Sequence, residues 1–218
     1  MTVPAAPTLV PVRVRTALTR LLAAGACRDF YLAGGTGLAF LLDHRASVDL
    51  DFFSRTNALD AAGRGALLER LQTLPRWATV DAADGTLHGL AGRVKVSFFR
   101  YAAPLVKPLV DRGALRLASL EDIGLMKLGA IIGRGSRKDF VDVYCVCRQV
   151  PLATLLALGA QKFTDAHDFT LQALKALTYF ADAEREPTLA LSRCRTWRDI
   201  TAYFTREARR LTREYLNR

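Results

Sequence analysis

Two aspartates, Asp49 and Asp51, stand two positions apart in residues 48–53, a segment whose residue pattern predicts a strand. The two-residue period of a strand puts both carboxylates on one face, roughly 7 Å apart along the chain. Proteins hold Mg²⁺ with one or two carboxylates plus substrate phosphates and water, and phosphoryl-type transfer requires such a cation. Any surface strand can show Asp-x-Asp, so this candidate Mg²⁺ site needs support from other residues.

A glycine turn precedes the acidic pair. Gly34 and Gly35 follow the short apolar segment 30–32 and lead, with Thr36, into an apolar segment that predicts a helix over residues 36–42. A glycine turn that opens a helix offers a phosphate free backbone N–H groups and a favourable dipole, and Thr36 adds a hydroxyl donor. The pattern is neither a Walker loop nor a dinucleotide-binding turn. A turn formed only for tight packing is the alternative.

Two polar residues lie between these motifs. The planar guanidinium of Arg45 suits phosphate oxygens, and Ser47 can orient an aspartate or the loop by hydrogen bonding. The predicted nucleotide-binding residues are therefore Gly34, Gly35, Thr36, Arg45 and Ser47.

The segments GGTGLA at residues 34–39 and HRASVDLDFF at residues 44–53 resemble the nucleotidyltransferase toxins of the AbiEii type. The similarity continues in KLGAI at residues 127–131, RG at 134–135 and KDFVD at 138–142, and it covers roughly residues 25–148. It implies a polymerase-β-like fold, a bound nucleoside triphosphate with Mg²⁺, and, in toxin members, modification or inactivation of an RNA such as tRNA. It also implies a cognate antitoxin.

The later motifs have a physical interpretation of their own. Lys127, Ile131 and Arg134 fall at i, i+4 and i+7 on one helical face, so two cations could converge on one triphosphate. Asp139 and Asp142 share a face of the next predicted helix.

One of these two aspartates could act as a general base, and the resemblance favours Asp139 for chemistry. An ion pair between Lys138 and Asp142, at i and i+4 on an exposed face, is the alternative for Asp142.

The chain departs from the family pattern at one point. Polymerase-β-like enzymes commonly carry a third carboxylate on a later strand, whereas residues 93–99 offer Lys95 and Ser97 on one face. This leaves three alternatives open: Asp139 supplies the missing group, a single metal ion suffices, or the protein binds nucleotide without transferring it.

The elements that position these residues form an α+β pattern. Helices are predicted over residues 9–25, 36–42 and 60–74, and strands over 30–32, 48–53, 78–81, 86–90 and 93–101. The remaining segments, 120–132, 137–149, 152–163, 167–184 and 196–217, show helical spacing. We predict a nucleotidyltransferase core with a mixed sheet over residues 1–115 and a helical domain over residues 116–218.

Composition bounds the class of protein. The 218 residues are 50% hydrophobic and carry a net charge of +10, which favours polyanionic partners. No apolar run is long enough for a membrane span, the N-terminal residues lack a secretory pattern, and the four scattered cysteines suggest free thiols, so we predict a cytoplasmic protein without a membrane partner. The last 26 residues contain Arg193, Arg195, Arg198, Arg206, Arg209, Arg210, Arg213 and Arg218. These arginines contact RNA or form a solvated helix face.

The leading hypothesis is metal-dependent transfer of a nucleotide from a nucleoside triphosphate to an acceptor, most plausibly the 3′ end of an RNA such as tRNA. The protein would be the toxin of a toxin–antitoxin or phage-defence system. A small-molecule nucleotidyltransferase of the antibiotic-modifying kind and a non-catalytic nucleotide- or RNA-binding regulator are the alternatives. The candidate catalytic residues are Asp49, Asp51, Lys127 and Asp139, of which Asp49 and Asp51 hold Mg²⁺.

Overall fold

The computed structural model describes residues 7–165, 168–187 and 196–217. The chain divides into two compact units, Met1–Ser119 and Leu120–Arg218. The predicted domain boundary, between residues 115 and 116, lies close to this division and inside a short strand of the first unit.

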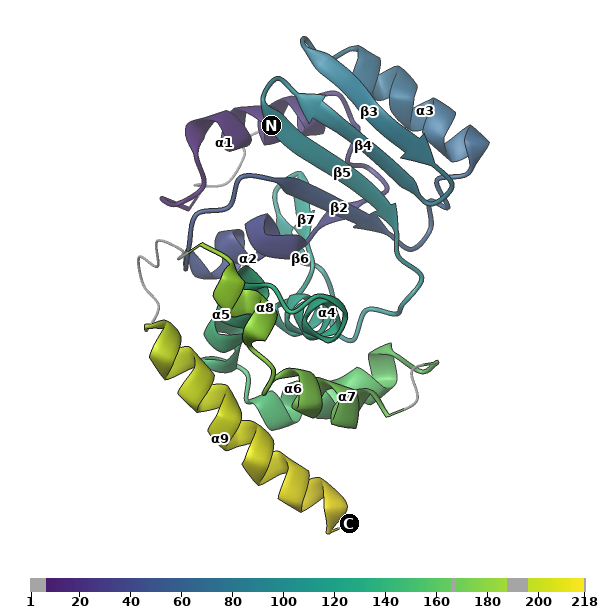
Figure 1. The fold of residues 1–218 in the computed structure, drawn as a ribbon. Helices are drawn as coiled ribbons and strands as arrows, with labels where there is room; N and C mark the ends of the chain where they lie inside the picture. Colours follow the sequence, from purple (N-terminus) through teal and green to yellow (C-terminus); the bar gives the residue numbers. More distant parts are fainter. Residues whose placement is uncertain (1–6, 166–167, 188–195, 218) are drawn as a thin grey trace. The chain divides into compact units, whose positions relative to one another are not determined.

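The first unit combines helices with one sheet (Figure 1). Its elements are α1 (Val12–Ala23), β1 (Tyr31–Leu32), α2 (Gly34–Leu42), β2 (Leu50–Ser54), α3 (Ala61–Gln72), β3 (Trp77–Ala83), β4 (Thr86–Ala91), β5 (Val94–Arg100), β6 (Val110–Arg112) and β7 (Leu115–Leu117).

Within the described residues, the strands form a sheet in the order β3-β4-β5-β2-β1-β7-β6. The pairs β2–β5 and β1–β7 are parallel, and the other neighbours are antiparallel. The predicted mixed sheet is thereby confirmed. Its centre is β2, which carries the second of the two candidate aspartates.

One face of the sheet packs against α1 and α3. Phe52 of β2 and Phe98 of β5 are buried, and their rings stack with centroids 5.2 Å apart. Leu18 of α1 and Leu67 of α3 belong to the same apolar core. Because side chains alternate along a strand, this burial of Phe52 places its neighbour Asp51 on the opposite face of the sheet.

Strands β6 and β7 were not predicted. Each is three residues long, and they form an antiparallel hairpin around Gly113, which has a positive φ of 62°. Leu115 and Leu117 are buried, whereas Asp111 and Arg112 are both exposed, so β6 lacks the alternation of apolar and polar residues that predicts a strand. Pairing of β7 with β1 therefore defines these strands more than their own sequence does.

The second unit is helical, as predicted (Figure 1). It contains α4 (Leu120–Gly133), α5 (Arg137–Cys147), α6 (Leu152–Lys162), α7 (Phe169–Ala176), α8 (Ala181–Arg185) and α9 (Trp197–Leu216). The single helix predicted over residues 167–184 is wrong, because a turn at residues 177–180 separates α7 from α8, and its first predicted residue lies outside the described residues.

An aromatic cluster fixes α9 against the rest of this unit. Phe140 of α5 packs edge-on against Trp197 and Phe204 of α9, with ring centroids 5.9 Å apart in both pairs. A capping box between Thr196 and Asp199 defines the first turn of α9. The long C-terminal helix therefore has a fixed inner face and a defined start.

In the part of the chain that the structure describes, no single helix has both the length and the apolar character to cross a membrane. The helices α5 and α6, bent by 110° relative to each other, reach these criteria only as a pair, by length and composition.

The prediction of free thiols holds for two of the described cysteines and is wrong for a third. Cys27 and Cys147 are free, whereas Cys145 is disulfide-bonded. Cys194 lies outside the described residues.

Candidate active site

The glycine turn lies where β1 passes into α2. Gly34 has a φ of 62°, a left-handed conformation that favours glycine. A Cβ atom at this position would lie 2.7 Å from Oδ2 of Asp51, which is closer than a side chain tolerates. Gly34 therefore lets the backbone turn sharply and lets the carboxylate of Asp51 reach the start of α2.

Gly35 makes room for two further predicted residues. A Cβ atom at Gly35 would lie 2.7 Å from Nη2 of Arg45 and 2.9 Å from Oγ of Ser47. Arg45 and Ser47 are both largely buried. The structure thus gathers the glycine turn, a guanidinium and a carboxylate at one end of α2.

The first turn of α2 suits an anion. Ala33, the residue before the helix, supplies no side-chain cap, and the first backbone hydrogen bond of the helix runs from Gly37 to Ala33. The N–H groups of Gly34, Gly35 and Thr36 consequently have no acceptor within the helix. Such groups, at the positive end of the helix dipole, bind phosphate in many proteins.

Thr36 has a positioning role in this structure. Its hydroxyl is buried, lies 2.8 Å from Oγ of Ser47 and donates to the backbone carbonyl of Asp49. These bonds tie α2 to the loop that enters β2. The hydroxyl of Thr36 is therefore engaged within the protein, whereas its backbone N–H has no acceptor within the helix.

Asp51 lies in β2 and Asp49 immediately before it, so the predicted strand begins two residues too early. Both aspartates are partly exposed. The described residues contain no group of three or more His, Cys, Asp or Glu side chains that could hold a metal ion. Two hard oxygen donors beside a phosphate-binding turn nevertheless fit Mg²⁺, which completes its shell with substrate phosphates and water.

A polar row extends from Asp51 across the sheet. Ser97 of β5 is the register partner of Asp51, and His88 of β4 is the register partner of Ser97. Nδ1 of His88 lies 3.1 Å from Oγ of Ser97. A hydroxyl supported by an imidazole therefore stands beside Asp51, where the sequence had indicated that a third carboxylate was missing. His88 lies outside the motifs that the sequence analysis identified, and only the hairpin register links it to Ser97.

The second unit contains a separate, buried charge cluster. Nζ of Lys127 in α4 lies 2.8 Å from Oδ1 of Asp139 and 2.8 Å from Oδ2 of Asp142, both in α5. The side chains of both aspartates are fully buried, and that of Lys127 is 8% exposed. One lysine thus holds two carboxylates that share a helix face, as their i, i+3 spacing predicted.

Two further residues hold Asp139. Nε of Arg134 lies 3.1 Å from its Oδ2, and Oγ of Ser136 donates to the same oxygen at 2.9 Å. Ser136 was missed in the sequence, although its spacing of three residues from Asp139 is typical of a capping arrangement. Lys127 and Arg134 therefore converge on a carboxylate in this structure.

These contacts set the charge states. Burial opposes the charged form of Lys127, but Asp142 and Asp139 outweigh it and raise the pKa of Lys127. Burial likewise opposes ionisation of Asp139, but Lys127 and Arg134 outweigh it and lower its pKa. At neutral pH the lysine is a cation and Asp139 an anion, and an anion of low pKa is a weak base.

The alternative pairing of Asp142 with Lys138 is wrong. Asp142 is buried and pairs with Lys127, whereas Lys138 is exposed. The predicted site residues therefore fall into two groups, one in each unit: the glycine turn with Arg45, Ser47 and the acidic pair, and the Lys127 cluster.

Comparison with known proteins assigns the family. The model of the family described as "Nucleotidyl transferase AbiEii toxin, Type IV TA system" matches residues 16–214. The chain belongs to the AbiEii nucleotidyltransferase toxin family. It is accordingly a nucleotidyltransferase, and both groups of site residues lie within the matched part of this AbiEii-family chain.

One relative in sequence and one solved structure are similar to this AbiEii-family protein over most of its length. An uncharacterized protein of Aquifex aeolicus (strain VF5) is 34% identical over 207 residues, which cover 93% of this chain and 95% of the relative. The fold is similar to that of MenT4, a nucleotidyltransferase toxin from Mycobacterium tuberculosis, with a TM-score of 0.56, 14% identity, and coverage of 91% of this chain and 84% of MenT4.

The antibiotic-resistance enzyme ANT(2'')-Ia, solved in complex with adenylyl-2''-tobramycin, is similar with a TM-score of 0.54 and 16% identity. The alignment covers 71% of this chain and 99% of that enzyme. These two structures confirm the predicted nucleotidyltransferase fold.

Proposed function

We propose that this AbiEii-family protein transfers a nucleotide from a nucleoside triphosphate to the 3′ hydroxyl of an RNA such as tRNA, in an Mg²⁺-dependent reaction, as the toxin of a toxin–antitoxin pair. One observation carries the proposal. Gly34 and Gly35 bring the carboxylate of Asp51 and the guanidinium of Arg45 against the start of α2, so a phosphate-binding turn and a metal-binding carboxylate adjoin each other.

On this proposal the triphosphate binds at the start of α2. The N–H groups of Gly34, Gly35 and Thr36 donate to phosphate oxygens, and Arg45 offsets their charge. Asp49 and Asp51 would hold Mg²⁺, which, when bound, neutralises charge that develops during phosphoryl-type transfer. The hydroxyl of Thr36, which also contacts Ser47, keeps the backbone at Asp49 in place.

The proposed reaction forms a bond between the acceptor oxygen and the α-phosphorus and breaks the bond to pyrophosphate. The acceptor hydroxyl passes its proton to solvent water as the new bond forms, and pyrophosphate leaves with the electrons of the broken P–O bond. In the second unit, Lys127 neutralises two buried carboxylates, so we assign it a structural role. Asp139 and Asp142 keep Lys127 protonated and oriented. The pKa of Asp139 is lowered, so Asp139 suits this role better than that of a general base.

Transfer of label tests the proposal. The purified protein is incubated with Mg²⁺, total cellular RNA and each α-labelled nucleoside triphosphate, alongside Asp51→Asn and a matched control, Asp81→Asn. Asp81 is an exposed aspartate of β3 in the same sheet. We expect label on RNA with the wild type and the control only. If label is transferred only when a small-molecule acceptor is added, the acceptor is a small molecule and not RNA. If the protein binds the triphosphate but transfers no label, a regulatory role is favoured.

The toxin assignment adds a cellular expectation. Expression of the wild type should arrest growth, the Asp51→Asn variant should not, and co-expression of the cognate antitoxin should restore growth. Arrest by Asp51→Asn at the same protein level would contradict toxicity through nucleotide transfer. The proposal places the reaction in the cytoplasm, where both substrates occur.

A further inference from the structure

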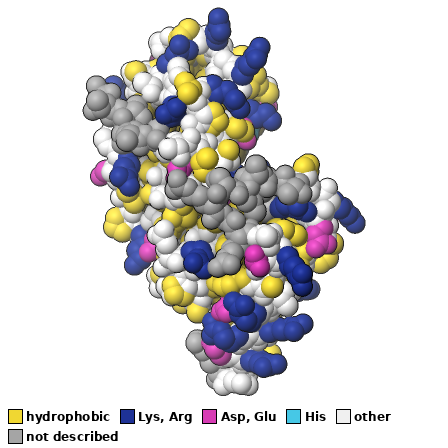
Figure 2. All heavy atoms as spheres, turned by 90° about the vertical axis from the view of Figure 1, so that its left-hand side faces the viewer, with side chains coloured by type: hydrophobic (Ala, Val, Ile, Leu, Met, Phe, Trp, Pro, Cys, Tyr) yellow, Lys and Arg dark blue, Asp and Glu magenta, His cyan; other side chains and the backbone are white. Residues whose placement is uncertain are grey.

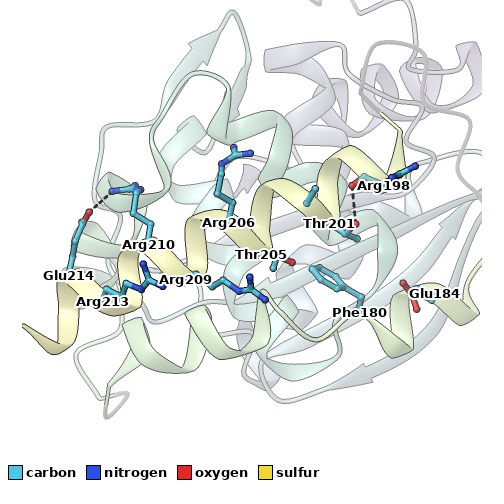
Figure 3. A pocket seen from close by; sticks show the side chains of 11 residues that line it. Phe180, Glu184, Arg198, Thr201, Thr205, Arg206, Arg209, Arg210, Arg213 and Glu214 are labelled. Atoms are coloured by element: carbon cyan, nitrogen blue, oxygen red, sulfur yellow. Dashed lines mark hydrogen bonds and ion pairs between the residues drawn. The ribbon is translucent and has the colours of Figure 1, made fainter.

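The outer face of α9 carries a groove lined by arginines. Figure 2 shows dark blue Lys and Arg side chains gathered at the lower end of the view, where α9 lies in Figure 1. The groove has a volume of about 880 Å³, and Arg198, Arg206, Arg209, Arg210 and Arg213 line it together with only two carboxylates, those of Glu184 and Glu214 (Figure 3). All five arginines are exposed. Arg193, Arg195 and Arg218 lie outside the described residues.

Two of these arginines already have partners. Arg210 lies 2.7 Å from carboxylate oxygens of both Glu207 and Glu214. Arg206 lies 3.5 Å from Glu207, and its guanidinium stands 5.6 Å from the centroid of the Tyr203 ring. Glu214, one of the two carboxylates of the groove, is therefore neutralised by Arg210.

The other three arginines differ. The guanidinium groups of Arg198, Arg209 and Arg213 form no ion pair or hydrogen bond with any residue that the structure describes. Their charge is available to a ligand, and arginine binds phosphate with two parallel hydrogen bonds.

The helix presents these side chains from a fixed backbone. Ile200, Phe204, Ala208 and Leu211 bury the inner face of α9. On the outer face the small side chains of Thr201, Ala202 and Thr205 lie between Arg198 and Arg209 and leave the hollow that Phe180 of the preceding turn borders. The phosphate backbone of a nucleic acid could therefore lie in the groove between the arginine side chains.

The spacing of the three unpartnered arginines indicates a polymer. Arg209 and Arg213 are about 6 Å apart along the helix axis, and Arg198 is about 16 Å from Arg209, at the helical rise of about 1.5 Å per residue. A single free phosphate would need cations that converge on one point. Cations spread over about 22 Å suit successive phosphates of a nucleic acid strand instead.

We propose that this arginine groove, built on α9 and centred on Arg198, Arg209 and Arg213, binds the phosphate backbone of the acceptor RNA. The choice of RNA rests on the proposed function. Binding through phosphates carries no base information, so the groove would hold the acceptor without selecting its sequence.

The test measures binding apart from transfer. A fluorescein-labelled RNA hairpin with a single-stranded 3′ end is titrated with the full-length protein, without nucleotide, over a series of salt concentrations, and fluorescence anisotropy reports the affinity. The double variant Arg209→Gln/Arg213→Gln should bind about tenfold more weakly at low salt, and the slope of log affinity against log salt should fall by about 2.

The matched control is Arg206→Gln/Arg210→Gln, which removes the same net charge from the same helix. Because these arginines already pair with Glu207 and Glu214, the control should lose clearly less affinity. Equal losses in both variants would overturn the groove in favour of general charge attraction, as would wild-type affinity in Arg209→Gln/Arg213→Gln. Thermal unfolding of each variant checks that α9 is intact.

The outcomes separate this proposal from the proposed function. RNA binding that needs Arg209 and Arg213, without label transfer to any RNA, would support the groove and contradict the RNA acceptor reaction. Label transfer to RNA with unchanged RNA binding in Arg209→Gln/Arg213→Gln would support the RNA acceptor reaction and contradict the groove. If the hairpin does not bind and these arginines instead govern capture of the cognate antitoxin, the groove is a protein interface and the proposal fails.

Discussion

The two groups of candidate site residues use charge in opposite ways. In the first unit, Asp49 and Asp51 are partly exposed beside a helix start whose N–H groups have no acceptor within the helix. In the second unit, Lys127 and its two aspartates are buried and satisfy one another at 2.8 Å. The first arrangement leaves N–H groups at a helix start without an acceptor in the helix, and the second has its charges satisfied within the protein. We therefore expect substitutions in the first group to lower activity and substitutions in the second group to lower the free energy of unfolding.

Replacing Asp51 should affect activity far more than stability. Asp51→Asn keeps the shape of the side chain but removes the charge that would hold Mg²⁺, so nucleotide transfer should fall at least about a thousandfold. The free energy of unfolding, from urea denaturation, should change by less than about 1 kcal/mol because Asp51 is partly exposed. A loss of stability comparable with that expected of a buried ion pair would erase the distinction between the two groups.

Replacing Lys127 should show the reverse balance. Lys127→Met removes the cation that the buried carboxylates of Asp139 and Asp142 share, while Arg134 stays on Asp139, and the loss should cost about 3–5 kcal/mol of unfolding free energy. Lys138→Met, on the exposed side of α5, is the control and should stay within about 0.5 kcal/mol of the wild type. A change below about 1 kcal/mol in Lys127→Met would mean that the cluster does not stabilise the second unit.

The glycine turn gives a smaller and mixed effect. Gly34→Ala puts a Cβ at a φ of 62° and 2.7 Å from Asp51, so we expect a loss of roughly 2 kcal/mol together with loss of activity. Gly65→Ala within α3, where a Cβ meets nothing within 4 Å, should instead stabilise the protein by roughly 0.5–1 kcal/mol. If both alanines behaved alike in urea unfolding, the turn would not need glycine.

The hydroxyl of Thr36 allows a finer test of the first group. Thr36→Val removes the donor to the Asp49 carbonyl and the contact with Ser47, at an expected cost of about 1–3 kcal/mol. Thr19→Val removes a hydrogen bond to Arg15 on an exposed helix face and should cost less than about 0.5 kcal/mol. Equal melting temperatures for the two variants would show that Thr36 does not hold the loop.

The sequence was sufficient where function depends on local spacing. Gly34, Gly35 and Asp51 could be placed at one site because a strand, a turn and a helix follow one another within a short segment. The row formed by Asp51, Ser97 and His88 could not, because cross-strand register comes from pairing between distant segments. A local pattern contains no information on such pairing.

The same reason explains the error at Asp142. The i, i+4 rule offered Lys138 as its partner, but packing of α5 against α4 buries Asp142 and brings Lys127 to it. Burial selects Lys127, which the sequence had not indicated as a partner of Asp142, since an ion pair gains more where water is excluded.

The buried cluster of the second unit should also make stability depend on pH. The lowered pKa of Asp139 contributes stability that is present above the unfolded value of 3.8 and lost as pH falls through the folded value. The raised pKa of Lys127 contributes stability that is present below 10.5 and lost as pH rises through its folded value. Between these limits the cluster should contribute a constant amount.

In Lys127→Met the sign on the acid side reverses. Burial without the cation raises the pKa of the carboxylates, so protonation stabilises the folded variant relative to its neutral-pH state. The difference in unfolding free energy between wild type and Lys127→Met should therefore be largest near neutral pH and shrink below about pH 4. Urea unfolding at a series of pH values measures it. A difference that stays constant down to pH 2 would mean that the carboxylates of this cluster are already neutral in the wild-type fold.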